Sequence, residues 1–121
     1  MSTVMIVGAS RGIGLELTKQ YAEAGDQVIA CARDTAAAEK LDSLAEASKN
    51  IVIKGLDIGD PKSIDAAKSE IGDSAIDKLI IVAGTTGGEH QSLDDLSIEE
   101  WHTALNINTI GPTLVARAFK S

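Results

Sequence analysis

The chain has 121 residues and a hydrophobic fraction of 44%, so we expect residues 1–121 to form one domain around a real core. Its 18 acidic and 11 basic residues give a net charge of −7, which argues against nucleic-acid and anionic-membrane partners, since both require a basic patch. A single cysteine and the lack of an apolar stretch of roughly 20 residues indicate a reducing, cytoplasmic location.

The first half of the chain alternates strand patterns with helix patterns. Thr3–Val7 and Gln27–Ala32 are apolar and rich in β-branched residues, which predicts two buried strands. Residues 13–24 and 35–47 have helical periodicity. In the first of these helices, four residues at helical spacing are expected to face the core: Ile13, Leu17, Tyr21 and Ala24.

The second half of the chain continues the alternation. Residues 51–56 and 78–82 predict two further strands, the second being a continuous apolar run. Between them, Asp60 and Pro61 are typical of a helix N-cap and first helical position, and Gly72 ends that helix.

A loop is predicted over residues 84–96, and a final helix over residues 98–119. Ser97 and Glu100 have the spacing of a capping box at the start of this helix. We expect a bend at Gly111-Pro112, because proline cannot donate to the helical ladder. Trp101 is expected to be a core or interface anchor.

Strands that alternate with helices in this way predict a parallel sheet covered on both faces. Because such crossovers are right-handed, we expect a Rossmann-like, doubly wound α/β fold of about four strands in the order 3-2-1-4. A ligand cleft is then expected at the carboxyl ends of strands 1 and 4, where the order reverses.

A glycine-rich stretch joins the first predicted strand to the first helix. Gly8, Gly12 and Gly14 allow a tight turn and a close approach of the backbone to a ligand. The free N–H groups at the start of the following helix favour an anion such as a phosphate. Such a stretch alone is a weak signal, and a purely structural turn is the alternative interpretation.

Four motifs in order make the pattern more specific. They are Gly8-Ala9-Ser10-Arg11-Gly12-Ile13-Gly14, Asp57-Ile58, Ala83-Gly84 and Asn108-Thr109-Ile110-Gly111-Pro112. Together they resemble the short-chain dehydrogenase/reductase family along the whole chain. The resemblance implies a dinucleotide cofactor at these residues: Gly8, Ser10, Arg11, Gly12, Ile13, Gly14, Arg33, Asp57, Ile58, Ala83 and Gly84.

The end of the second strand bears on which dinucleotide is bound. The resemblance places Ala32 where members that prefer NAD usually have an acid, and Arg33 follows it. A guanidinium binds a 2′-phosphate, and Arg11 resembles the second basic residue of members that prefer NADP. NADP(H) is therefore favoured, with NAD(H) possible if Asp34 takes the role of the acid. The alternative is that both arginines are solvated surface residues.

The remaining motifs imply further roles. Asp57 resembles the aspartate that accepts from the adenine amino group, with Ile58 against the ring, although a turn aspartate is the alternative. Asn108 resembles the family asparagine that supports the catalytic lysine through a water chain, and Asn106 is its rival. At residues 81–82, isoleucine and valine replace two family asparagines, which puts the stabilisation of the central sheet there in doubt.

The family's catalytic serine and Tyr-x-x-x-Lys pair are absent from these residues. The single tyrosine, Tyr21, has Gly25 in place of the lysine. We therefore expect the cofactor-binding first half of an oxidoreductase that is inactive alone; the alternative is a non-catalytic dinucleotide-binding or scaffold module. The apolar edge of strand 4 and the last helix predict a homo-oligomer, such as a dimer. His90 and His102 have no cysteine nearby and predict no metal site.

Overall fold

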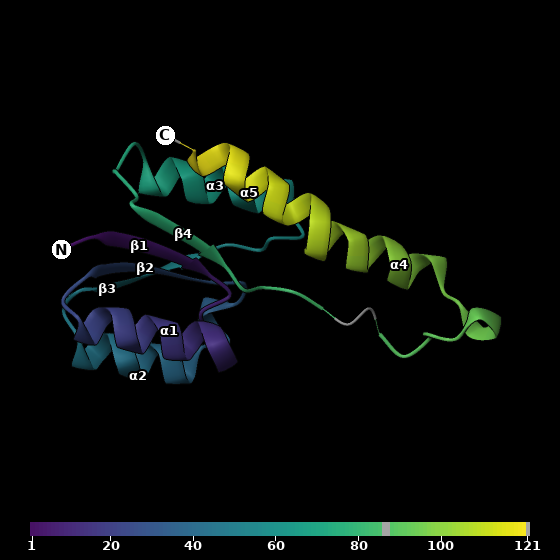
Figure 1. Cartoon of the computed structure of the whole chain (residues 1–121), viewed down its shortest axis with the longest axis horizontal. Helices are drawn as coiled ribbons and strands as arrows, with labels where there is room; N and C mark the ends of the chain where they lie inside the picture. The colour runs from purple at the N-terminus through teal and green to yellow at the C-terminus, as the bar shows by residue number, and fades with distance from the viewer. Residues whose placement is uncertain (86–87, 121) are drawn as a thin grey trace.

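The computed structural model describes residues 1–85 and 88–120. Residues 86 and 87 of the predicted loop, and Ser121, lie outside the described residues. Figure 1 shows a twisted sheet between two helical layers, with α1 and α2 on one face and α3 and α5 on the other. Helix α4 extends away from the sheet, at the far end of the long connection that follows β4.

The predicted alternation of strands and helices is confirmed. The strands are β1 (Thr3–Val7), β2 (Gln27–Ala32), β3 (Ile51–Gly55) and β4 (Lys78–Ile81). The helices are α1 (Gly12–Glu23), α2 (Glu39–Ala47), α3 (Pro61–Ile71), α4 (Ile98–Leu105) and α5 (Gly111–Phe119). All the strand pairs are parallel, and the order β3-β2-β1-β4 is the predicted one.

The side chains of the central strand β1 alternate between two aliphatic cores. Val4 and Ile6 pack on the α1/α2 face, where Leu41 of α2 is completely buried. Met5 and Val7 pack on the opposite face, where Val115 of α5 is completely buried. A strand covered on both faces is uniformly apolar, which is why the sequence shows a continuous run here.

The prediction of which α1 residues face the core is partly wrong. Leu17 and Tyr21 pack against the core, but Ile13 is 73% exposed and Ala24 is also exposed. The buried face consists of small residues one turn apart: Gly14, Thr18 and Ala22. The helix takes this orientation because Gly14 lies directly against the carbonyl of Gly8, which brings the start of α1 close to the sheet.

The helix predicted over residues 35–47 is also divided. Thr35–Ala37 form one 3₁₀ turn (η1), and α2 begins only at Glu39. Ala38 between them has non-helical dihedral angles (φ −98°, ψ 56°) and is buried in the core. Burial of this small side chain therefore outweighs the helical propensity of the alanine-rich sequence.

The last predicted helix is interrupted earlier than expected. Between α4 and α5, Asn106–Ile110 form a π-helical turn (η3), in which the Gly111 N–H donates to the Asn106 carbonyl. Gly111 itself is helical (φ −56°, ψ −54°), so the irregularity lies before Gly111-Pro112 and not at it. Pro112 has no N–H for the regular ladder, which favours such a local rearrangement.

Trp101 on α4 is 54% exposed, so it is not a core anchor, and its alternative role as an interface anchor stays a prediction. Other large apolar side chains of α4 and the π turn are exposed as well: Ile98, Leu105 and Ile110. Of the helices that the structure describes, none is long and apolar enough to cross a membrane.

Candidate functional site

The candidate site lies at the carboxyl ends of β1 and β4, which are neighbours in the sheet. The loop after β1 is fixed by the Cys31 carbonyl of β2, which accepts from Gly8 N at 3.0 Å and Ala9 N at 2.9 Å. The segment after β4 is fixed by the Val7 carbonyl, which accepts from Val82 N at 2.9 Å and Ala83 N at 3.2 Å. Both segments therefore leave the sheet side by side.

Close contact between these segments explains two of the glycines. Gly8 has a φ of 95°, and a Cβ there would lie 2.8 Å from the Ala83 backbone nitrogen. A Cβ at Gly14 would overlap the Gly8 carbonyl oxygen and the Val82 side chain. The chain can thus turn from β1 into α1 only because both residues lack a side chain.

The start of α1 has the chemistry of an anion site. Arg11 is the N-cap residue, no side chain caps the helix, and no acid lies in its first turn. In contrast, Asp60 caps α3 and Ser97 caps α4. An uncapped helix N-terminus carries free N–H groups and the positive end of the dipole, so it favours a phosphate. Ile13, exposed on this turn, is open to a ligand.

The end of β2 places Arg33 and Asp34 beside this turn. Ala32 is buried, whereas Arg33 and Asp34 are exposed. The Asp34 carboxylate accepts from the Ala36 N–H at 3.1 Å and thereby caps the 3₁₀ turn. Arg11 is exposed as well, so both guanidinium groups are accessible at the glycine-loop edge.

The turn after β3 is held from several sides. Asp57 Oδ1 accepts from the Gly59 N–H at 2.9 Å, and the Asp57 N–H donates to Ser63 Oγ at 2.7 Å. Ile58 is only 6% exposed and belongs to the core beneath α5. Its contact with a ring, which the resemblance implies, stays a prediction.

Asn108 makes two hydrogen bonds with the segment that follows β4. Its Oδ1 accepts from the Thr85 N–H at 2.8 Å, and its Nδ2 donates to the Thr85 carbonyl at 2.7 Å. A Cβ at Gly84 would lie 3.2 Å from Asn108 Oδ1, so these motifs meet. The structure therefore brings Asn108 together with Gly84 and Thr85.

The two positions with apolar residues in place of family asparagines are packed into the cores. Ile81 packs on the α3/α5 face and Val82 on the α1/α2 face. The hydrogen bonds of the Val82 and Ala83 backbones to Val7 join the end of β4 to β1 without any side-chain amide.

Two contacts near this edge were not predicted from the sequence. Asn106 Nδ2 donates to the Gly59 carbonyl at 2.8 Å, and a Cβ at Gly111 would overlap the Ile58 carbonyl. The π turn is thus packed against the turn after β3. The sequence signal for these contacts is the pair of asparagines at positions 106 and 108, but the residues that they contact lie far away along the chain.

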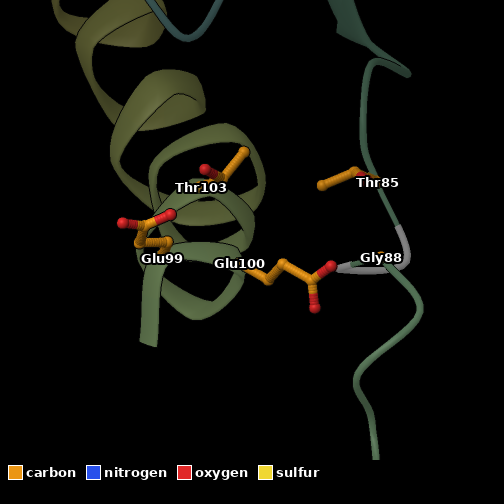
Figure 2. Close-up of a pocket in the computed structure, with 5 residues that line it drawn as sticks. All are labelled: Thr85, Gly88, Glu99, Glu100 and Thr103. Atoms are coloured by element: carbon orange, nitrogen blue, oxygen red, sulfur yellow. The ribbon is translucent and has the colours of Figure 1, made fainter. Parts of the chain in front are cut away.

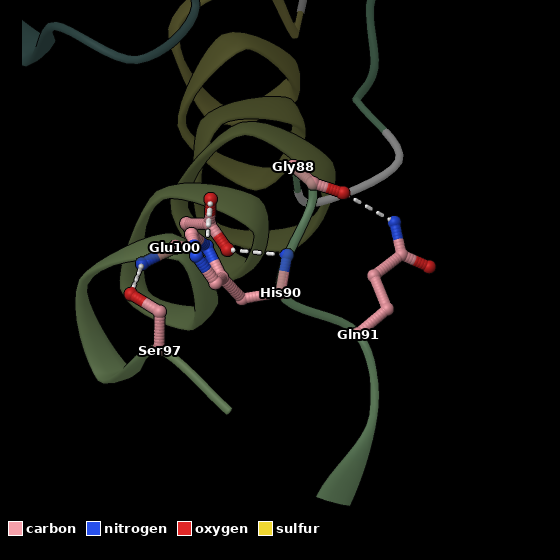
Figure 3. A network of polar contacts seen from close by, with 5 residues as sticks. All are labelled: Gly88, His90, Gln91, Ser97 and Glu100. Atoms are coloured by element: carbon pink, nitrogen blue, oxygen red, sulfur yellow. Dashed lines mark hydrogen bonds and ion pairs between the residues drawn. The ribbon is translucent and has the colours of Figure 1, made fainter. Parts of the chain in front are cut away.

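Hydrogen bonds join the loop after β4 to the start of α4. His90 Nδ1 lies 3.0 Å from Glu100 Oε1, and the His90 N–H donates to Glu100 Oε2 at 3.1 Å (Figure 3). The predicted capping box is therefore only half formed: Ser97 Oγ accepts from the Glu100 N–H, while the Glu100 side chain reaches His90. The hydrogen bond to the His90 side chain lowers the pKa of Glu100 below its ordinary value of 4.5.

A cavity of about 310 Å³ lies between this loop and α4. Figure 2 shows Glu100 pointing from α4 towards Gly88 of the loop. Thr85, Glu99 and Thr103 complete the lining. Within the described residues, no cluster of three His, Cys, Asp or Glu side chains is placed to hold a metal ion.

Tyr21 and Cys31 do not contribute reactive groups to the site. The Tyr21 ring packs against the α1/α2 core and lies 5.3 Å from Lys78 Nζ. Burial raises the pKa of the Cys31 thiol to about 12, although the charge of Lys54 opposes this shift. A thiol in this state is not a nucleophile at neutral pH.

The sequence pattern of the short chain dehydrogenase family matches residues 2–121, and the chain belongs to this family. A short chain dehydrogenase of Aspergillus terreus, tazN, is 34% identical over 97% of this chain, which spans 26% of that protein.

Solved structures agree with this assignment. A carbonyl reductase from Pseudomonas aeruginosa in complex with NADP is 34% identical, with a TM-score of 0.91 over 98% of this chain and 54% of the reductase. An NADPH-bound carbonyl reductase from chicken fatty liver is 31% identical, with a TM-score of 0.90 over 98% of this chain and 47% of that protein. The chain thus spans about half the length of these reductases.

Proposed function

We propose that the edge formed by the glycine turn, the end of β2 and the segment after β4 binds NADP(H). The observation that carries this proposal is the uncapped N-terminus of α1, directly behind a turn in which a Cβ at Gly12 would meet only open space. A dinucleotide supplies the pyrophosphate that such a site favours. The NADP-bound state of two similar reductases supports the same choice.

The preference for the 2′-phosphate is proposed from the arginines. Arg11 and Arg33 are exposed and free of ion pairs within the described part of the chain. Asp34 is the acid that would favour NAD(H), and its Oδ1 accepts from the Ala36 N–H, so this single acid faces two arginines. The electrostatics of this edge therefore favour the additional phosphate of NADP(H).

Calorimetric titration with NADPH and NADH tests the proposal. We expect NADPH to bind more tightly, and Arg33→Ser to weaken NADPH about tenfold or more, because hydrogen bonds to charged groups contribute about 1.5–3 kcal/mol. NADH should change by less than about twofold, since it lacks the 2′-phosphate. The control is Arg117→Ser, which removes an exposed arginine of α5. Tighter binding of NADH than of NADPH to the unchanged chain would overturn the assignment.

In a full-length enzyme of this family, the bound dinucleotide would supply the chemistry of hydride transfer. In this chain Gly8, Gly12 and Gly14 would shape the turn that holds the pyrophosphate, and Asp57 would face the adenine end. Asn108 would orient the segment after β4, which is the contribution proposed for it. Because Tyr21 packs away from this edge, we propose that these 121 residues bind the cofactor without turnover. A non-catalytic binding or scaffold module remains the second candidate.

We also propose that the chain self-associates. Four large apolar residues are at least half exposed along α4 and the π turn: Ile98, Trp101, Leu105 and Ile110. In addition, β4 is an edge of the described sheet, and its apolar side chains are only partly buried. An edge strand and an apolar helix surface both favour pairing with a second copy.

A further inference from the structure

Two asparagines of the π turn hold two different loops of the proposed cofactor edge. Asn106 donates to the Gly59 carbonyl, in the turn after β3, at 2.8 Å. Asn108 makes two hydrogen bonds with Thr85, in the segment after β4. Side chains two residues apart on a helix point to nearly opposite sides, so one turn of helix can reach both loops.

The hydrogen bond of Asn106 is linked to other hydrogen bonds within the turn after β3. The peptide group whose carbonyl receives the Asn106 amide carries the Asp60 N–H, which donates to the Asp57 carbonyl at 3.0 Å. Gly59 N–H donates in turn to Asp57 Oδ1 at 2.9 Å. These part-buried hydrogen bonds involve two successive peptide groups of the turn, Ile58–Gly59 and Gly59–Asp60, and neighbouring hydrogen bonds polarise one another. The orientation of the Asp57 carboxylate is thus connected to the Asn106 amide.

Packing supports the same connection. Gly111, at the end of the π turn, lies so close to the Ile58 carbonyl that a Cβ would overlap it. Ile58 is buried, so the turn is anchored on one side by the core and on the other by Asn106. Among the described residues, Asp57 Oδ2 has no hydrogen-bond partner, which leaves it open to a ligand.

We propose that Asn106 is a positioning residue for the adenine end of the dinucleotide, acting through the orientation of Asp57. This inference rests on the proposed function, because it takes the Asp57 turn as the adenine site. Asn106 need not touch the cofactor. Its amide fixes the turn that does, while Asn108 fixes the segment on the other side of the π turn.

The test uses the complete 121-residue chain and the variant Asn106→Asp, which keeps the size of the side chain and removes its donor N–H. The ligands are adenosine 2′,5′-bisphosphate, which carries only the adenine half, and NADPH. We expect Asn106→Asp to weaken both ligands about tenfold, and to accelerate hydrogen exchange of the Asp60 amide without ligand. The matched control is Asn50→Asp, which removes the same kind of donor from the Ala22 and Asp26 carbonyls, away from this edge, and should leave the bisphosphate within about twofold.

The outcomes separate the inference from the proposed function. Two outcomes overturn the role of Asn106 and leave the proposed function intact. In the first, the unchanged chain binds the ligands and Asn106→Asp binds them equally tightly. In the second, the affinity for the bisphosphate falls equally in both variants. Failure of the unchanged chain to bind either ligand overturns the proposed function, and the role of Asn106 with it. Asn106→Leu replaces the aspartate variant if thermal unfolding shows that the latter does not fold, and the same criteria apply.

Discussion

At the scale of single residues, the glycine turn is tightly constrained by its packing. A methyl group at Gly14 would meet the Gly8 carbonyl and the Val82 side chain, and the backbone oxygen cannot rotate away. We expect Gly14→Ala to lower the free energy of unfolding by about 1–3 kcal/mol, the usual cost of overpacking. Urea denaturation measures this loss.

The control for this variant is Gly55→Ala at the end of β3. A Cβ there would lie 3.9 Å from Thr35 Cγ2, which is an ordinary contact, and Gly55 does not have a positive φ. This substitution should change stability by less than about 1 kcal/mol and in the favourable direction. Equal stability of the two variants would contradict the close packing inferred at Gly14.

Residues with local partners were predictable from the sequence, and those with distant partners were not. Asp60 and Pro61 start α3 as expected, because a helix cap depends on residues one turn away. Asn106 binds Gly59, which lies 47 positions earlier, and no local pattern encodes that contact. Ile13 was expected to be buried because its spacing is helical, but the close approach of Gly14 turns it outwards.

At the scale of elements, a histidine–glutamate pair joins the connection after β4 to the start of α4. The hydrogen bond to the His90 ring lowers the pKa of Glu100, so the ionised carboxylate stabilises the folded loop. This contribution is present above the ordinary value of 4.5 and is lost as the pH falls through the lowered pKa.

We expect His90→Ala to raise the pKa of Glu100 towards 4.5, because the ring that holds the carboxylate is removed. Carbon NMR titration of the Glu100 carboxyl group measures this shift directly. Gln91→Ala, at the neighbouring position of the loop, is the control and should leave the titration unchanged. An unaltered Glu100 titration in His90→Ala would show that the pair does not form in solution.

The existence and order of the elements could be predicted better than their internal breaks. The four parallel strands and their order follow from alternating patterns and right-handed crossovers. The break at Ala38 and the π turn over Asn106–Ile110 depend on what each segment packs against. Helical propensity is continuous through both breaks, so the sequence alone predicts longer helices than the structure has.

At the scale of the whole molecule, exposed apolar surface governs association. We expect a mass of at least a dimer by light scattering at tens of micromolar chain, and a lower mass for Trp101→Glu, because a buried charge on α4 opposes pairing. Ser69→Glu adds the same charge on an exposed position of α3 and should not change the mass. A monomeric unchanged chain would contradict the proposal, whereas persistent association of Trp101→Glu would direct attention to the β4 edge.

The buried Cys31 gives the molecule a reporter of its own folding. It is the chain's single cysteine, it lies inside the central sheet, and its carbonyl holds the glycine turn while its thiol is kept protonated by burial. A thiol reagent can therefore modify it only when the sheet opens, so the rate of labelling counts openings of the native chain. A ligand that binds the glycine turn stabilises the closed form by mass action and therefore slows the labelling of Cys31. Occupancy of the site is thus coupled to the reactivity of an atom that no ligand touches.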